Sequence, residues 1–141
     1  MKILIIGLPG SGKTTFSKKL YEELEKRNIL VARYNGDEVR EYYKDWDFSS
    51  AGRLRQLDRM VENAELCERN GIVSICDFIC PYELFRDYFD ANITIWMDTI
   101  KESKYEDTNK VFEEPSKYDY RITSFQQIDN FDFFPIAQLV E

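Results

Sequence analysis

Short apolar runs alternate with amphipathic stretches along this chain. The run Lys2–Ile6 is apolar and rich in β-branched residues, which is typical of a strand buried in a parallel sheet. In the stretch Thr15–Asn28, Phe16, Leu20 and Leu24 recur at every fourth position. This spacing predicts an amphipathic helix directly after a glycine-rich connection.

The rest of the chain repeats this alternation. Further strands are predicted at Ile29–Tyr34, Ile72–Phe78, Asn92–Met97 and Tyr118–Thr123. Helices are predicted at Glu38–Tyr43, from Ser49 or Ser50 to Asn70 with Leu54, Leu57, Val61 and Ala64 on its buried face, and from Pro81 to Phe89. Together these elements predict an α/β fold: a doubly wound, parallel, five-stranded sheet between two layers of helices, with ligands at the carboxyl ends of the strands.

Two segments lack a clear period. Residues 101–117 are charged, and we expect a short lid-like loop there with one turn of helix. The tail 124–141 contains four phenylalanines, so we expect it to pack on the body of the protein. The length of 141 residues suits a single domain over 1–141, long enough to bury about two-thirds of its unfolded surface.

Composition narrows the classes of function. A net charge of −7 and a pI near 4.8 argue against a general nucleic-acid-binding protein. No apolar run approaches the ~20 residues of a membrane span, and the N-terminal run is too short for a signal peptide. Three cysteines form no metal or disulfide pattern, so we expect buried thiols in a reducing, cytoplasmic compartment. Without histidine, any proton-handling group must be a carboxylate, Lys, Tyr or Cys.

The glycine-rich connection carries the sharpest chemical signal. It matches the phosphate-loop pattern G-x-x-x-x-G-K-[ST], between a predicted strand and a predicted helix. That arrangement aims backbone N–H groups and a helix N-terminus at one anion. Lys13 is expected to reach the β- and γ-phosphates of ATP, and the Thr14 hydroxyl to ligate Mg²⁺. The predicted ATP-binding residues are Gly7, Leu8, Pro9, Gly10, Ser11, Gly12, Lys13, Thr14 and Thr15.

Acidic residues follow three of the predicted strands. Phosphoryl transfer needs a carboxylate at the acceptor hydroxyl and another near the Mg²⁺ water shell. We expect Asp37 to take the first role and Asp77, which ends a hydrophobic run, to take the second through water. Asp98 is a weaker candidate of the same kind. The alternative for each is a solvated or helix-capping acid.

Several motifs, in order and at nearly the right spacing, resemble the adenylylsulfate kinases over about residues 1–100. That family transfers the γ-phosphate of ATP to the 3′-hydroxyl of adenosine 5′-phosphosulfate. Besides the phosphate loop, the similarity lies in Asn35-Gly36-Asp37-Glu38-Val39-Arg40, Phe48-Ser49 with Arg53, Cys76 to Tyr82 with Arg86, and Ile95 to Thr99.

The resemblance implies roles for particular positions. Lys13 and Asp37 take the catalytic positions, and Phe78 stacks on the adenine of the acceptor. The implied acceptor-binding residues are Arg40, Phe48, Arg53, Gln56, Phe78, Ile79 and Cys80. Guanidinium groups and an aromatic face suit a phosphosulfate and an adenine. A surface salt bridge is the alternative for the arginines, Arg59 being the weakest candidate, and core packing is the alternative for the phenylalanines. The resemblance also implies a homodimer.

The chain departs from the family pattern at several positions. Asn35 replaces an Asp, Gly52 and Gln56 replace an Asp and an Asn, Cys80 replaces a Ser, and Asp77 stands where a small residue is usual. The basic lid segment has no counterpart, although Lys101, Lys104 and Lys110 lie in the shorter interval. Two other functions therefore stay open: a phosphate-loop kinase for another hydroxyl, of a nucleoside, sugar or polynucleotide end, and a non-catalytic nucleotide-binding module.

Overall fold

The first strand, β1 (Lys2–Gly7), is buried along its whole length at the centre of a five-stranded sheet. The computed structural model describes residues 1–141. The strands pair in parallel in the order β2-β3-β1-β4-β5. The remaining strands are β2 (Val31–Asn35), β3 (Val73–Asp77), β4 (Ile93–Met97) and β5 (Tyr120–Ile122). The predicted doubly wound parallel sheet is confirmed.

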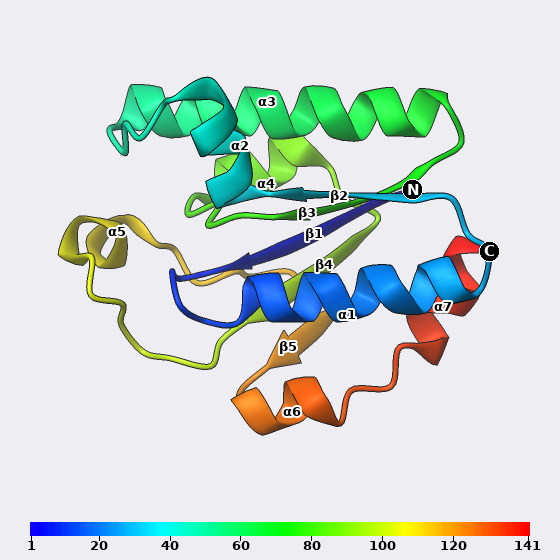
Figure 1. Cartoon of the computed structure of the whole chain (residues 1–141). Coiled ribbons are helices and arrows are strands. Elements are labelled where there is room, and N and C mark those ends of the chain that lie inside the picture. The colour runs from blue at the N-terminus through cyan, green and yellow to red at the C-terminus, as the bar shows by residue number, and fades with distance from the viewer.

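Helices cover both faces of the sheet (Figure 1). One face carries α2, α3 and α4, and the other carries α1, α6 and α7, while α5 lies beyond the carboxyl ends of the strands. Their bounds are α1 (Lys13–Lys26), α2 (Gly36–Tyr43), α3 (Ser50–Arg69), α4 (Glu83–Phe89), α5 (Glu106–Val111), α6 (Phe125–Asp129) and α7 (Phe134–Val140). None of these helices has both the length and the apolar character of a membrane span.

The alternation of side chains along β1 builds two hydrophobic cores. Ile3 and Ile5 lie in the core formed with α1 and the C-terminal helices. Leu4 and Ile6 lie in the core formed with α3 and α4. Because both faces of β1 are covered, the strand reads as a continuous apolar run.

The C-terminal tail packs on α1. Phe131 and Phe133 contact the ring of Phe16, with centroid distances of 5.0 Å and 5.3 Å, and α7 completes the same core. Phe125 and Phe134, by contrast, are about half exposed. Of the four phenylalanines, two therefore close the core and two stay half-exposed.

The long helix α3 begins where expected, and Leu57, Val61 and Ala64 of its predicted inner face are buried. Ser49 is its N-cap, and its hydroxyl accepts a hydrogen bond from Gly52 N at 3.2 Å. Leu54 is 48% exposed, so its predicted place on the buried face was wrong. The inward positions of the first turns are instead Arg53 and Gln56, because this end of the helix faces a polar cavity and not the core.

Helix α4 starts two residues later than Pro81 predicts, with Tyr82 as its N-cap. Cys80 adopts a left-handed backbone conformation (φ 45°). The carbonyls of Cys80 and Pro81 accept hydrogen bonds from the Arg86 guanidinium at 2.9 Å and 3.2 Å. This side chain holds the preceding turn outside the helix.

Candidate active site

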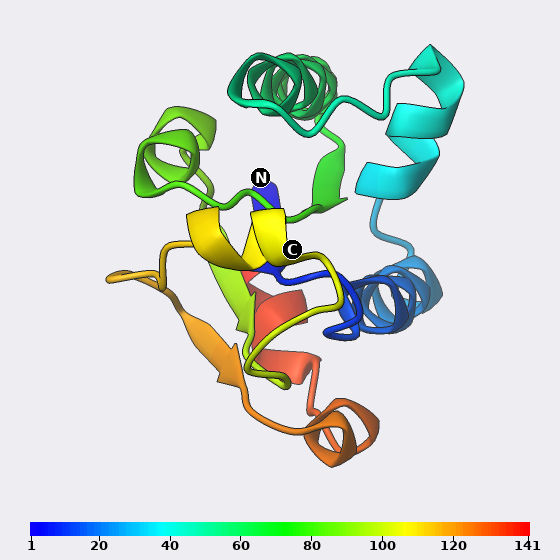
Figure 2. The ribbon, with the colours of Figure 1, turned by 90° about the vertical axis from the view of Figure 1, so that its left-hand side faces the viewer.

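One large cavity lies at the carboxyl ends of the strands, where the fold class predicts a ligand site. Its volume is about 1230 Å³. Figure 2 looks onto this edge of the sheet, with α5 in front of it. The predicted site residues that line the cavity are Pro9, Gly10, Gly12, Lys13, Thr14, Thr15, Asp37, Arg40, Phe48, Arg53, Gln56, Asp77, Phe78, Ile79 and Cys80.

The phosphate loop connects β1 to α1. Hydrogen bonds to its backbone carbonyls, from within the loop and from Thr99, fix its conformation. Lys13 Nζ donates to the carbonyl of Leu8 at 2.9 Å, and Thr99 Oγ1 donates to the carbonyl of Ser11 at 2.7 Å. Gly7, Leu8 and Ser11 do not line the cavity but form the base of the loop. Gly12 needs to be a glycine, because its φ is +96° and a Cβ there would lie 2.8 Å from Ile128 Cδ1.

Lys13 is the first residue of α1, at the end of the phosphate loop, where burial disfavours its charged form. Burial lowers the pKa of Lys13 to about 8, and the nearby carboxylates of Asp77 and Asp37 only partly oppose that effect. An anionic phosphate beside the ammonium restores the preference for the charged form. The position therefore favours binding of a polyphosphate.

A hydrogen-bonded chain links the first turn of α1 to the ends of β2 and β3. Asn35 Nδ2 donates to Thr14 Oγ1 at 2.9 Å and to Asp77 Oδ2 at 2.7 Å. Asn35 and Asp77 are register partners on neighbouring strands. An ionised carboxylate at position 35 could not donate a hydrogen bond to Thr14 or to Asp77. The amide of Asn35 donates to both, and so it complements the acid at position 77.

Asp77 is almost completely buried, with 1% of its surface exposed. Burial raises the pKa of Asp77 to about 6, against the opposing effects of the Asn35 hydrogen bond and the charges of Arg33 and Lys13. Arg33 Nη1 lies 3.4 Å from Asp77 Oδ1. Asp77 thus holds Asn35, which in turn holds the Thr14 hydroxyl.

Asp37 lines the same cavity as Asp77 but differs from it in exposure and in its hydrogen bonds. It is the second residue of α2, it is exposed, and it lines the cavity. Its carboxylate makes no hydrogen bond or ion pair with the protein, so it is free to accept one from a ligand hydroxyl. Asp98, in contrast, accepts hydrogen bonds from Arg121 at 2.6 Å and 3.0 Å and does not line the large cavity.

Another wall of the same cavity is formed by the buried side chains of Arg40 and Arg53 together with the ring of Phe48. The guanidinium carbons of Arg40 and Arg53 lie 4.1 Å and 5.3 Å from the centroid of the Phe48 ring. Arg40 Nη1 donates to two backbone carbonyls, and Arg53 Nε donates to the carbonyl of Phe48 at 2.9 Å. Neither side chain makes a surface salt bridge. Burial lowers the pKa of both groups, which favours an anionic partner.

The remaining predicted acceptor residues lie between these walls. Gln56 Nε2 donates to the carbonyl of Gly36 at 2.9 Å, while Gln56 Oε1 is buried without a partner. Phe78 lines the cavity and also packs in the core, where its ring lies 6.2 Å from that of Phe89. Burial raises the pKa of the Cys80 thiol to about 12, so this group is a neutral contact surface and not a nucleophile.

The loop 101–117 supplies one wall of the cavity and contains α5. Thr108 is buried and accepts a hydrogen bond from Arg53 Nη2 at 2.8 Å. Arg86 Nη2 donates to the carbonyl of Glu113 at 2.6 Å. Of the lysines in this interval, Lys104 lines the cavity, whereas Lys101 lines a separate cavity of about 230 Å³. Lys110 lines neither cavity.

The sequence analysis missed several residues that line the cavity. Asn35 was noted only as a departure from a pattern, although its amide lies at the centre of the Thr14 network. Most of the other residues come from segments without periodicity, where no local signal distinguishes a cavity wall from a loop, whereas Phe85 belongs to the predicted helix Pro81–Phe89. They are Trp46, Phe85, Ile100, Glu102, Ser103, Tyr105, Asp107, Thr108, Phe125, Ile128 and Asp129.

Arg59 does not reach the cavity. Its Nη2 donates to Asp45 Oδ2 at 2.7 Å, and its guanidinium lies 4.3 Å from the centroid of the Tyr43 ring. Arg59 therefore forms a structural ion pair, which was the alternative to a role in ligand binding. Arg40 and Arg53 form no such pair.

A phosphate loop after the central strand of a β2-β3-β1-β4-β5 sheet defines the phosphate-loop kinase fold. Within that fold, the model of the adenylylsulphate kinase family matches residues 1–117, and the chain belongs to this family.

Individual relatives agree with this assignment. The chain is 34% identical to a probable adenylyl-sulfate kinase of Pseudomonas aeruginosa over 71% of its own length and 47% of that protein. It is 38% identical to a probable adenylyl-sulfate kinase of Archaeoglobus fulgidus over 61% of its length and 56% of that protein. The matched part of the chain thus spans about half the length of these curated relatives.

Solved structures share the fold across the whole chain. The Mycobacterium tuberculosis APS kinase CysC, in complex with AMPPNP and APS, superimposes with a TM-score of 0.75 at 20% identity, covering 99% of this chain and 94% of that one. Shikimate kinase from Aquifex aeolicus gives a TM-score of 0.65 at 17% identity, with 99% and 96% covered.

Proposed function

We propose that this protein transfers the γ-phosphoryl group of ATP to the 3′-hydroxyl of adenosine 5′-phosphosulfate. The observation that carries the proposal is that a single cavity joins three parts: the phosphate loop, the free carboxylate of Asp37, and the Arg40–Phe48–Arg53 wall. Family membership supports the same reaction.

The phosphate loop binds the triphosphate of ATP. Backbone N–H groups at the start of α1 point toward the anion, and Lys13 bridges the β- and γ-phosphates. The residues around Thr14 also suit a Mg²⁺ ion. The chain gathers no group of three or more acidic, Cys or His side chains that would bind a metal alone. Mg²⁺ in such sites is held mainly by phosphate oxygens and water, and needs only one or two ligands from the protein. The Thr14 hydroxyl and the buried carboxylate of Asp77 are groups of this kind.

When bound, Mg²⁺ neutralises charge on the β- and γ-phosphates. Thr14 Oγ1 would ligate the ion directly, and Asp77 would act on its water shell. Asn35 fixes the position of the Thr14 hydroxyl, because one amide hydrogen bonds Thr14 Oγ1 and the other bonds Asp77 Oδ2.

The Arg40–Phe48–Arg53 wall binds the acceptor. Burial removes part of the hydration of both guanidinium groups, and a phosphosulfate anion would compensate for that loss. The edge of Phe78 in the cavity offers an aromatic surface to the adenine. Gln56 Oε1, which has no protein partner, supplies an acceptor for a base N–H group.

Asp37 performs the proton transfer. Its carboxylate accepts the proton of the 3′-hydroxyl while that oxygen attacks the γ-phosphorus, and the bond to the β-γ bridging oxygen breaks to release ADP. The helix α5, anchored by Thr108 on Arg53, lines the cavity on the acceptor side and there limits the access of water.

The test is ADP release by the purified chain with ATP and Mg²⁺. Three reactions are compared: adenosine 5′-phosphosulfate, no acceptor, and an oligonucleotide with a 5′-hydroxyl. The proposal expects rapid release with the phosphosulfate alone. Release only with another hydroxyl would reassign the acceptor, and ATP binding without release in any reaction would indicate a non-catalytic binding module.

A further inference from the structure

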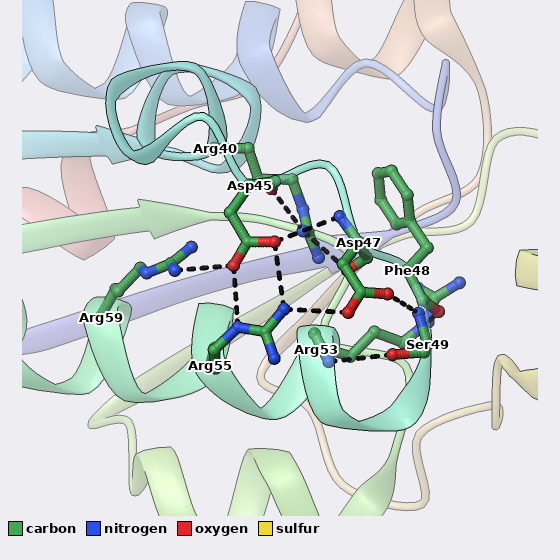
Figure 3. Close-up of polar contacts among 9 residues, drawn as sticks. Arg40, Asp45, Asp47, Phe48, Ser49, Arg53, Arg55 and Arg59 are labelled. Carbon is green, nitrogen blue, oxygen red and sulfur yellow. Dashed lines mark hydrogen bonds and ion pairs between the residues drawn. The ribbon is translucent and has the colours of Figure 1, made fainter.

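The loop Lys44–Ser49 connects α2 to α3. Ion pairs with arginines of α3 hold it against that helix (Figure 3). The Asp45 carboxylate accepts hydrogen bonds from Arg55 Nε at 3.0 Å and from Arg59 Nη2 at 2.7 Å. Arg55 Nη2 also donates to Asp47 Oδ2 at 2.9 Å. The side chains of Asp45 and Arg59 are only 13% and 15% exposed, so solvent screens this pair weakly.

The same loop is seated on the first turn of α3 by a close approach that only glycine allows. A Cβ at Gly52 would lie 2.0 Å from the carbonyl oxygen of Asp47. Ser49 also caps the helix and accepts from Gly52 N. The loop therefore has little freedom to move away from α3.

The inner side of the loop forms part of the acceptor wall. The carbonyls of Asp45 and Asp47 both accept from Arg40 Nη1, at 2.9 Å and 3.0 Å. Trp46 lies between these two fixed carbonyls and lines the cavity with 48% of its surface exposed. Nothing in the fold of the core requires a half-exposed indole here, and a flat ligand ring would cover it.

We propose that Trp46 contacts the acceptor, and that Asp45, through Arg55 and Arg59, is the positioning residue that holds Trp46 at the cavity wall. The inference deepens the proposed function and rests on it. The ligand that fits is a purine nucleotide: its base packs on the indole, and its anionic group faces the neighbouring Arg40. Aromatic stacking of this kind tolerates any large aromatic ring but not its removal.

The test compares Trp46→Ala, Trp46→Phe and Asp45→Asn in steady-state kinetics with adenosine 5′-phosphosulfate and ATP. We expect Trp46→Ala to raise KM for the phosphosulfate by about tenfold and to leave KM for ATP within about twofold. Trp46→Phe recovers most of the loss. Asp45→Asn raises the same KM by a smaller factor with little change in kcat. Tyr42→Ala, a neighbouring exposed aromatic, and Asp58→Asn, an exposed acid of α3, are the matched controls.

A second readout does not depend on turnover. The chain has two tryptophans, and the other one, Trp96, is 5% exposed and does not line the large cavity. Adenosine 5′-phosphosulfate should therefore change the tryptophan emission of the wild type in a saturable way, and this change should be absent from Trp46→Phe.

The outcomes separate this inference from the function on which it rests. If the wild type turns over the phosphosulfate but Trp46→Ala has an unchanged KM and the emission is insensitive to it, the role of Trp46 is wrong and the proposed function stands. If the wild type neither turns over nor binds the phosphosulfate, both are wrong.

Discussion

The two halves of the cavity are built in different ways. The nucleotide half is a contiguous backbone loop, 7–15, between a buried strand and a helix, with Asn35 and Asp77 behind it. The acceptor half is assembled from side chains of segments far apart in the sequence, held in place by Arg40, Arg53 and Arg86. From this difference we expect triphosphate binding to depend mainly on the geometry of the backbone loop, and acceptor choice to depend on a few buried guanidinium groups.

The largest effect is expected in the nucleotide half. Lys13→Ala removes the ammonium that we propose bridges the phosphates and should reduce kcat/KM for ATP by at least about 100-fold. Steady-state ADP release measures the loss. Lys18→Ala, an exposed lysine in the same helix, is the control and should be silent. Unchanged activity of Lys13→Ala would remove the basis of the proposed function.

Asp37→Asn should separate binding from transfer. The amide cannot accept the proton of the acceptor hydroxyl, so kcat should fall by about 10²–10⁴-fold while ATP affinity stays the same. Single-turnover kinetics and calorimetric titration with a non-hydrolysable ATP analogue give the two quantities. Glu41→Gln, on the same helix, serves as the control. Wild-type turnover by Asp37→Asn would mean that another group receives the proton.

The Asn35–Asp77 pair should behave as one unit. Asn35→Asp places two carboxylates within hydrogen-bond distance in a buried site and removes the donor to Thr14, which should cost about 1–3 kcal/mol of unfolding free energy. Combining it with Asp77→Asn exchanges the two groups and should recover most of the loss. Urea unfolding of the four proteins forms a double-mutant cycle. Additive losses, with no recovery in the double variant, would show that the pair is not coupled.

A smaller effect is expected where α5 docks on the acceptor wall. Thr108→Val keeps the shape but leaves Arg53 Nη2 without its partner, which should cost about 1–3 kcal/mol locally. Amide hydrogen exchange should then be faster in α5, and KM for the acceptor should rise while KM for ATP does not change. Thr123→Val, at an exposed threonine, is the control. Equal protection of α5 in wild type and Thr108→Val would show that this hydrogen bond does not anchor the helix.

The smallest effect concerns the pH dependence of the loop 44–49. The arginines of α3 hold the pKa of Asp45 well below its usual range, and the Ser49 hydrogen bonds, followed by Arg55, lower that of Asp47 to about 2. A carboxylate with a depressed pKa stabilises the fold above its unfolded-state pKa and loses that contribution as the pH falls through the folded value. The stability difference between wild type and Asp45→Asn should therefore be constant from pH 7 to about pH 4 and shrink below it. A difference that shrinks near neutral pH would contradict this account.

The nucleotide half was the more predictable one. The phosphate loop and its flanking elements follow from local spacing, because loop shape, helix start and strand burial are all decided within the first 28 residues. The five strands and their parallel direction follow from the same alternation, whereas their order in the sheet does not. The pairing of the Asn35 amide with the Asp77 carboxylate was not predictable, because it depends on which strands lie side by side.

The acceptor half was predictable only by family resemblance. Arg40 and Arg53 line the cavity, but their partners are backbone carbonyls and a threonine that no pattern indicates. Leu54 was misplaced because the helical period alone does not show that the first turns of α3 face a cavity. Trp46 escaped notice because its loop has no period at all.

The most direct test of the account identifies the product. The purified chain is incubated with ATP, Mg²⁺ and adenosine 5′-phosphosulfate, and the nucleotide product is examined by phosphorus NMR. The account predicts a new phosphomonoester on the 3′-oxygen, formed in equal amount to ADP, with the phosphosulfate intact. ADP formed without that phosphomonoester, or phosphate carried on another oxygen, would contradict it.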